Sequence, residues 1–344
     1  MASTKALCGS ALASVYWRDD NSQYRFQNFT DEMPNYLLTE RDNIWVYYID
    51  VYGWVCQVKS YKGEWIAGSQ QCFKAPRFNT PLAAVVYPDY SKTSRRPSAN
   101  PEIHIFCIAI SDTNTPSIRR FIKTKNTDSW EESEKDIPSE NLLTLSSIAA
   151  IEYKDTHVRV FWQDTTHNIR QTICNTSDGS DWAVEKEKIS EKPAWRGTPI
   201  AAAAVSGLRD SLTSVLAYRH SDRTLVVARI ETDPAQILFL IPTTEKYGMS
   251  PTGSVALVAW SFGKIWVFYE GFTDGLHRLR LYKSPEKTSS VFTGNITTAK
   301  AADEGSLAGA AVPADSSGNA PASIFYQPPG EINIVEMRLE YSTA

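Results

Sequence analysis

The sequence lacks most of the features that identify a common enzyme or a membrane protein. Its 344 residues contain no apolar run close to the ~18 residues that a helix needs to cross a bilayer. They also lack a Cys-x-x-Cys pair, the metal-binding spacings His-x-x-x-His and His-Glu-x-x-His, a phosphate-binding glycine loop and a nucleophile elbow. We therefore expect no membrane span, no metal and no other cofactor.

Neither sign of charge dominates the chain. The 35 basic and 39 acidic residues give a net charge of −4, and they are interspersed. This balance argues against a nucleic-acid groove or a polybasic membrane surface. The acidic residues also form no conspicuous pair of the kind that glycosidases use for acid/base catalysis.

The cysteines are five in number and leave the cellular compartment open. Cys107 occupies an alternating strand position and is expected to be a buried thiol. Cys56 and Cys72 flank one hairpin and could form a disulfide if the protein passes through a secretory pathway. Three glycosylation sequons would then be available, at Asn28, Asn175 and Asn295. Residues 1–15 carry too short an apolar stretch to predict a signal peptide.

What the sequence does contain is a repeat, clearest between Ser147 and Trp182. Its segments SIAAIEY, HVRVFWQD and NIRQTICN are short, and the last two alternate apolar and polar residues. A Gly-Ser-Asp turn then leads to Trp182. Three strands with turns between them and a fourth around the tryptophan predict one antiparallel four-stranded meander.

Six copies of this unit follow one another along the chain. The small-residue strand occurs at Ala11–Val15, Pro81–Val86, Ser147–Tyr153, Pro199–Ala204, Ser254–Trp260 and Ser306–Val312. The second strand occurs at Ile44–Ile49, Ile103–Ile108, Val158–Gln163, Thr213–Tyr218, Ile265–Glu270 and Ala322–Gln327. The predicted fold is an all-β six-bladed β-propeller with four-stranded antiparallel blades, and a two-sheet sandwich is the alternative.

The repeats divide a single domain, residues 1–344, into blades. The predicted blades cover residues 8–75, 76–140, 141–192, 193–248, 249–300 and 301–344. Two insertions interrupt them, at 18–43 and 88–101. The first is rich in aromatic residues, among them Tyr24 and Phe26, and we expect it to fold over a ligand cavity. The second is polar and proline-rich and is expected to be a mobile loop.

The repeats resemble those of the fungal fucose-binding lectins of the Aleuria type, and the likeness covers nearly the whole chain. It is carried by the small-residue inner strand, by VRVFWQD and NIRQ in the third blade, and by the tryptophan that follows. In that family a second-strand arginine and a third-strand glutamate hold the sugar hydroxyls between blades, and an aromatic ring stacks on the sugar. The resemblance implies a six-bladed propeller with ligand sites between its blades.

Carrying the sugar-binding positions over to this chain shows that no blade keeps the arginine–glutamate pair. The arginine position is predicted at Trp45, His104, Arg159, Ser214, Trp266 and Ser323. The glutamate position is predicted at Gln57, Arg120, Gln171, Val227, Arg278 and Ile334. Only the third blade keeps its arginine, Arg159, and the partner of that arginine is the neutral Gln171. Ordinary fucose binding is therefore expected to be absent or very weak.

The replacements suit a flat, oxygen-bearing apolar ligand better than a sugar. The chain is similar in this respect to the hetero-Diels–Alderases of fungal tropolone–sesquiterpenoid biosynthesis, which join a terpene alkene to a tropolone-derived quinone methide on a lectin-like propeller. Such a cycloaddition needs a shaped pocket and a hydrogen-bond donor but no nucleophile. The predicted donors are Arg278, His277 and Arg159, and the predicted substrate-binding residues are Trp45, Trp266, His104, Arg120, Gln171, Tyr24 and Phe26.

Two other functions stay open at this point. One is a carbohydrate-binding protein with a single altered glycan site in the third blade. The other is a propeller that serves only as an interaction scaffold. In that case the residues at the former sugar positions only pack the blades together. For the enzyme, the partners would be small apolar or aromatic substrates, without nucleic acid or membrane, and a homodimer is compatible with the sequence.

Overall fold

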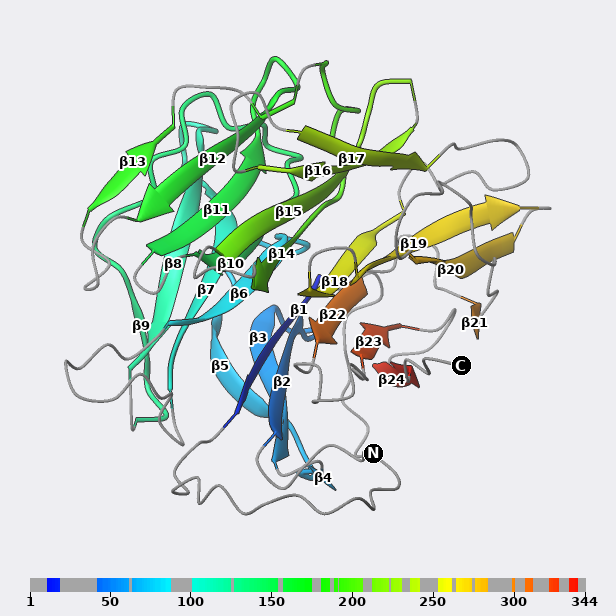
Figure 1. Ribbon diagram of the computed structural model, residues 1–344. Coiled ribbons are helices and arrows are strands. Elements are labelled where there is room, and N and C mark those ends of the chain that lie inside the picture. The colour runs from blue at the N-terminus through cyan, green and yellow to red at the C-terminus, as the bar shows by residue number, and fades with distance from the viewer. Residues whose placement is uncertain are drawn as a thin grey trace, which may run out of the picture.

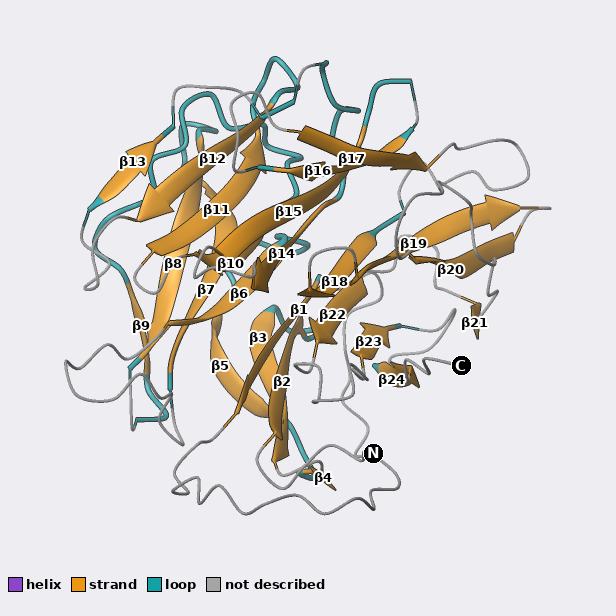
Figure 2. Cartoon of the chain, viewed as in Figure 1, coloured by secondary structure: helices purple, strands orange, loops and turns teal. Residues whose placement is uncertain are grey.

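The computed structural model describes most of the β-sheet framework of the chain. The described residues are 11–18, 42–61, 64–87, 101–124, 127–153, 157–174, 181–185, 189–190, 192–206, 212–222, 224–230, 236–241, 253–261, 264–273, 276–283, 299–300, 307–311, 322–327 and 334–339. This part of the chain is built from strands and connecting loops and contains no helix (Figure 2).

The strands form six antiparallel sheets, which we call blades 1 to 6 in chain order. Blade 1 contains β1 (Leu12–Arg18), β2 (Asp42–Ile49), β3 (Trp54–Tyr61), β4 (Glu64–Trp65) and β5 (Gln70–Lys74). Blade 2 contains β6 (Leu82–Tyr87), β7 (Glu102–Ile110), β8 (Pro116–Lys123) and β9 (Trp130–Glu132). Blade 3 contains β10 (Ala149–Tyr153), β11 (His157–Gln163), β12 (Ile169–Cys174) and β13 (Trp182–Val184).

The second half of the chain continues the pattern. Blade 4 contains β14 (Ile200–Ser206), β15 (Leu212–Arg219), β16 (Leu225–Arg229) and β17 (Gln236–Ile241). Blade 5 contains β18 (Val255–Ser261), β19 (Lys264–Thr273), β20 (Leu276–Lys283) and β21 (Ala299–Lys300). Blade 6 contains β22 (Leu307–Ala311), β23 (Ala322–Tyr326) and β24 (Val335–Leu339), so the described residues supply three of its strands.

The innermost strands of the six sheets form a closed ring (Figure 1). Each contacts the next, in the order β1, β6, β10, β14, β18 and β22, and β22 returns to β1. Ser14 Oγ donates a hydrogen bond of 2.9 Å to the carbonyl oxygen of Gly309 and so links the first blade to the last. The predicted six-bladed propeller is confirmed, and two stacked sheets are excluded.

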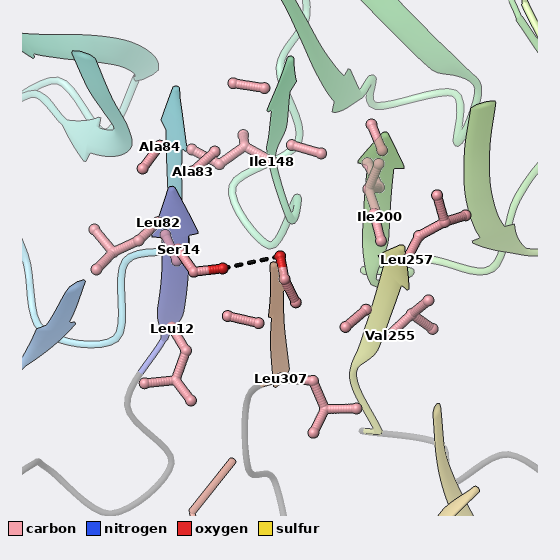
Figure 3. A pocket seen from close by; sticks show the side chains of 18 residues that line it. Leu12, Ser14, Leu82, Ala83, Ala84, Ile148, Ile200, Val255, Leu257 and Leu307 are labelled. Atoms are coloured by element: carbon pink, nitrogen blue, oxygen red, sulfur yellow. Dashed lines mark hydrogen bonds between the residues drawn. The ribbon is translucent and has the colours of Figure 1, made fainter. Parts of the chain in front are cut away.

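Small side chains line the inner strands because six of them crowd around one axis. Figure 3 shows these residues around the central channel, whose cavity measures about 100 Å³. Gly309 marks the tightest approach. A Cβ atom at this position would lie 2.9 Å from Val258 Cγ2, closer than real Cβ atoms come to a neighbour, so any larger residue here would require β22 or Val258 to shift.

The hydrophobic core is divided into six clusters, one between each pair of adjacent blades. The outer tryptophans of the first three blades each touch the preceding blade. Trp65 contacts Phe325, Trp130 contacts Tyr47 and Trp182 contacts Phe106, with ring centroids 5.8, 5.8 and 5.9 Å apart in edge-on geometry. These tryptophans therefore clamp neighbouring blades together.

The disulfide considered between Cys56 and Cys72 is not formed, and both cysteines carry free thiols. The strand register explains why. A bulge between Val55 and Cys56 pairs Cys56 with Gln71 and leaves Cys72 as the extra residue of β5. Cys56 packs in the cluster shared with blade 6, whereas Cys72 packs against the cluster shared with blade 2. The two thiols thus face opposite sides of one sheet.

Several predictions concern residues outside this framework. Tyr24 and Phe26, and residues 19–41 and 88–100 of the two insertions, lie outside the described residues. The predicted blade boundaries stay predictions. Among the described residues, no helix is long and apolar enough to span a bilayer.

Candidate functional site

The candidate sites lie between neighbouring blades, where the second and third strands of one blade face the next. In blade 3 the second-strand position is Arg159, which pairs with Ile173, and the third-strand position is Gln171, which pairs with Phe161. Trp45 and Gln57 in blade 1, and His104 and Arg120 in blade 2, occupy the same registers, as predicted. The strand pairing therefore defines both positions in every blade.

One of the two predicted positions was wrong in each of blades 4, 5 and 6, whereas Val227, Trp266 and Ser323 occupy the predicted registers. The second-strand position of blade 4 is Val215 instead of Ser214, because Val215 faces blade 5 and Ser214 faces blade 3. The third-strand position of blade 5 is Leu281 instead of Arg278, because the β19–β20 hairpin is three residues longer than a blade 3 hairpin. In blade 6 the third-strand position is Glu336 instead of Ile334, because Glu336 pairs with Phe325.

Between blades 2 and 3, the structure brings a buried guanidinium against an aromatic ring. Arg120 on β8 is 7% exposed, and its Cζ lies 5.5 Å from the ring centroid of Trp182 on β13. Its Nη2 donates a hydrogen bond of 3.0 Å to Ser133 Oγ. A guanidinium has five N–H donors in a fixed plane, so this group can also hold an oxygen of a ligand that lies against Trp182.

His104 on β7 completes this site from the same face of blade 2. Its ring is buried, and Nε2 lies 2.7 Å from Glu102 Oε1. Burial lowers the pKa of His104 from 6.5 and the charge of Arg120 lowers it further, while the hydrogen bond to Glu102 and the charge of that carboxylate act in the opposite direction. At neutral pH the imidazole is therefore uncharged, and the guanidinium is the cation of this site.

The lowered pKa of His104 predicts that acid destabilises the protein. Below about pH 6.5 the unfolded chain protonates this histidine while the folded protein resists protonation, so the free energy of unfolding falls as the pH falls. We expect thermal unfolding to show this loss between about pH 7.5 and 5.5, and the variant His104→Gln to show a flatter dependence. An equally steep dependence in the variant would contradict the assignment.

Between blades 3 and 4, Arg159 is buried but reaches an uncharged partner. Its Nη1 lies 3.5 Å from Ser214 Oγ across the interface. Gln171 on β12 is also buried, and its Nε2 donates to Glu185, which follows β13 and is exposed. The carboxylate on this face thus bonds to the amide of Gln171, and the predicted residues Arg159 and Gln171 do belong to one interface.

Between blades 6 and 1 lies a carboxylate that the predicted positions did not include. Glu336 Oε1 accepts a hydrogen bond of 2.7 Å from Ser323 Oγ, and Glu336 Oε2 accepts one of 2.8 Å from Trp65 Nε1. Glu336 is half-buried. The motif IVEMRL contained the signal, because its glutamate alternates with apolar residues on a strand, but the strand register was needed to place it.

The two remaining predicted tryptophans are buried at their interfaces. Trp266 packs in the cluster between blades 5 and 6, and Trp45 packs between blades 1 and 2. The Nζ atoms of Lys59 and Lys123 lie 4.3 and 5.2 Å from the Trp45 ring centroid. No sequence pattern indicated this cluster. Arg278 and His277 lie on β20 opposite Gly271 and Phe272, and the structure describes only their backbone.

The central channel is a poor alternative site. Its cavity of about 100 Å³ is well below the roughly 300–1,000 Å³ of pockets that hold drug-sized ligands, and aliphatic side chains dominate its lining. Within the described part of the chain, no group of three or more histidine, cysteine, aspartate or glutamate side chains converges as a metal site. The cationic and aromatic groups are instead gathered between the blades.

Comparison with known proteins establishes the fold of this chain. No family model matches the sequence, and no curated protein matches it. A triple arginine-to-alanine variant of AofleA from Arthrobotrys oligospora has a TM-score of 0.67 at 14% identity, with 98% of this chain and 85% of that chain covered. A variant of Aleuria aurantia lectin in complex with α-methyl-L-fucoside has a TM-score of 0.63 at 16% identity, covering 97% and 93%.

A bacterial protein described as of unknown function, from Dyadobacter fermentans, shares the same architecture. Its TM-score is 0.61 at 10% identity, with 99% of this chain and 97% of that chain covered. The chain therefore has the propeller fold of the Aleuria lectin over almost its whole length. At identities this low, the likeness shows the fold alone.

Proposed function

We propose that this protein is a hetero-Diels–Alderase that joins a terpene alkene to a tropolone-derived quinone methide in a site between two blades. The observation that carries the proposal is the position of Arg120. A buried guanidinium lies against an aromatic ring at the place where the fucose-lectin pattern has a carboxylate. This exchange removes the acceptor that a sugar hydroxyl needs and supplies a donor for a carbonyl or enolate oxygen.

The proposed reaction forms one C–C bond and one C–O bond between the alkene carbons and the ends of the heterodiene, and no atom leaves. The carbonyl oxygen of the quinone methide gains negative charge as these bonds form. Arg120 donates a hydrogen bond to that oxygen and stays charged throughout. Trp182 offers a flat face to the ring, and neutral His104 provides a second polar contact.

Pre-orientation supplies the rest of the rate enhancement. The reaction has no proton to move, so holding the two partners at reacting distance is the main task of the protein. The interface between blades 3 and 4, with Arg159 and Gln171, is a second place for a polar group of a substrate. Arg278, His277, Trp45, Trp266, Tyr24 and Phe26 remain proposed contributors from the sequence pattern.

The test is a turnover assay with the two substrate classes. A cyclic sesquiterpene alkene is mixed with a quinone methide released in solution from a hydroxymethyl tropolone, and the products are separated by chiral chromatography. We expect one stereoisomer, formed at a rate proportional to protein concentration. A racemic product formed at the buffer rate, equal to that with heat-denatured protein, would contradict the proposal.

A second candidate function, carbohydrate binding, is favoured by one specific observation. Glu336, Ser323 and Trp65 together present a carboxylate, a hydroxyl and an indole between blades 6 and 1. The Aleuria aurantia lectin was solved with α-methyl-L-fucoside, and such a set could hold a sugar hydroxyl here. Calorimetry with methyl α-L-fucoside is expected to show no tight binding. One saturable site per chain that Glu336→Gln abolishes would establish this second candidate instead.

A further inference from the structure

The fourth strand of each of the first three blades supplies an oxygen atom to the third-strand residue of the site. In each blade a side-chain N–H of the third-strand residue donates a hydrogen bond to a side-chain oxygen of the residue opposite it. The three pairs are Gln57 with Gln70, Arg120 with Ser133 and Gln171 with Glu185. The same contact thus recurs at one place in three blades, although the residues that form it differ.

Strand pairing brings the two members of each pair together. Gln70 on β5 is the strand partner of Gln57 on β3. Ser133 directly follows β9, and its backbone N–H donates a hydrogen bond of 2.8 Å to the carbonyl oxygen of Arg120. The corresponding bond in blade 3 measures 3.1 Å. Because opposite residues of neighbouring strands project their side chains from the same face of the sheet, each fourth-strand side chain lies beside the site residue.

The two members of each pair differ in their exposure to solvent. The third-strand residue is buried, whereas its fourth-strand partner is exposed or half-buried. A buried N–H group that lacks an acceptor is costly. The fourth-strand oxygen therefore satisfies one donor of the buried group at the rim of the interface, and it fixes the direction of the rest of that group.

The guanidinium of Arg120 has contacts from two blades. The ring centroid of Trp182 in blade 3 lies 5.5 Å from Cζ, and Ser133 Oγ in blade 2 accepts a hydrogen bond of 3.0 Å from Nη2. A ring contact constrains the distance of a guanidinium, whereas a hydrogen bond at one Nη atom sets the direction of the other donors in the rigid plane. Direction matters because a donor stabilises a developing oxyanion best when it already points at that oxygen.

We propose that Ser133 is a positioning residue that orients Arg120 toward the substrate oxygen, and that the fourth strand has this orienting role in blades 1 to 3. The catalytic consequence rests on the proposed cycloaddition, whereas the orientation of Arg120 is a property of the protein without substrate. Ser133 touches no reacting atom and acts through Arg120.

The first experiment compares the turnover of Ser133 variants with that of the parent. Ser133→Ala removes the acceptor, and we expect kcat to fall about tenfold or more with little change in KM, because the bond from Arg120 to the substrate oxygen strengthens in the transition state. Ser133→Thr keeps the hydroxyl and should retain nearly parental turnover. Ser133→Val has the shape of threonine without the hydroxyl and should lose as much as alanine.

The control is Ser129→Ala, which removes an exposed hydroxyl of the same blade that bonds to Thr127. This variant should behave like the parent. Parental turnover in Ser133→Ala and Ser133→Val, or equal losses in the valine and threonine variants, would overturn the proposal. Thermal unfolding checks that each variant folds.

A double-mutant cycle tests whether the effect passes through Arg120. In the Arg120→Leu background, Ser133→Ala should cause no further loss of turnover, because the group that the hydroxyl orients is gone. An additional loss as large as that in the parental background would overturn the proposal, since Ser133 would then act by another route.

Side-chain NMR of the full chain measures the orientation without substrate. The Nε–Hε signal of Arg120 is assigned by its absence in Arg120→Leu, and its heteronuclear NOE reports how rigidly the guanidinium is held. We expect a lower NOE in Ser133→Ala and a parental value in Ser133→Thr, and an unchanged value in Ser133→Ala would overturn the proposal. If the parent shows no turnover, the proposed cycloaddition fails, and this NMR measurement alone decides the role of Ser133.

Discussion

Replacing Arg120 with leucine is expected to slow the cycloaddition about 10²- to 10³-fold without unfolding the protein. A single preorganised donor aimed at a developing oxyanion contributes this much in enzymes whose donors have been removed. Arg120 is the buried cation of the site between blades 2 and 3. Leucine occupies most of the volume of the aliphatic part of the arginine side chain, so the variant should stay packed. The measurement is the rate of chiral product formation at saturating substrate.

Arg119 provides a matched control, because it is the neighbouring residue on the opposite face of β8. Its side chain is 38% exposed and forms ion pairs with Glu132 and Asp136. Arg119→Leu removes the same charge and leaves the site intact, so it should retain nearly parental activity. If the two variants lost activity equally, or if Arg120→Leu kept it, the donor would not be Arg120.

Replacing Trp162 with alanine is expected to cost about 3–5 kcal/mol of unfolding free energy, the range measured for large aromatic side chains in cores. Trp162 on β11 is 1% exposed and fills the cluster between blades 2 and 3. Its Nε1 also donates a hydrogen bond of 3.2 Å to Thr172 Oγ1. The variant leaves a cavity at the interface that supports Trp182, and urea unfolding followed by circular dichroism measures the loss.

Trp195 is the comparison for this experiment. It is half-buried beneath the guanidinium of Arg219, whose Cζ lies 4.9 Å from its ring centroid. Trp195→Ala should therefore cost clearly less than Trp162→Ala. Equal losses would mean that packing between blades 2 and 3 contributes no more than a surface contact, and would contradict the description of the blade interfaces as packed cores.

The blade architecture could be predicted because packing around the axis restricts the sequence directly. Runs such as PIAAAA and SLAGAAV are short, apolar and made of small residues, since larger side chains would collide where six strands converge. Gly309 illustrates the point, with Val258 Cγ2 only 2.9 Å from where a Cβ would lie. The spacing of these runs then determines the number of blades.

The site was less predictable because it depends on strand register. The alternating pattern of LHRLRLYK continues through β20, so nothing in it shows that Leu281 instead of Arg278 pairs with Phe268. For the same reason, the sequence pattern assigned the third-strand position of blade 6 to Ile334 instead of Glu336. A shift of one to three residues changes which side chain occupies the site, and hairpin length controls that shift.

Side-chain contacts between blades were even harder to predict from the sequence. The stretch FIKTKNTDSW is rich in polar residues and is typical of a solvated hairpin, yet Lys123 is buried because blade 1 covers it. The approach of Arg120 to Trp182 likewise joins residues of two different sheets. Such pairs form when neighbouring blades pack against each other, and no local sequence pattern predicts them.

The most direct test of the proposed function is a crystal structure of the protein soaked with tropolone. Tropolone has the flat ring and the carbonyl oxygen of the proposed substrate. We predict that it lies between blades 2 and 3 with its ring against Trp182 and an oxygen within hydrogen-bonding distance of the Arg120 guanidinium. Tropolone bound only in the central channel, or a sugar in this interface where tropolone fails to bind, would contradict the assignment.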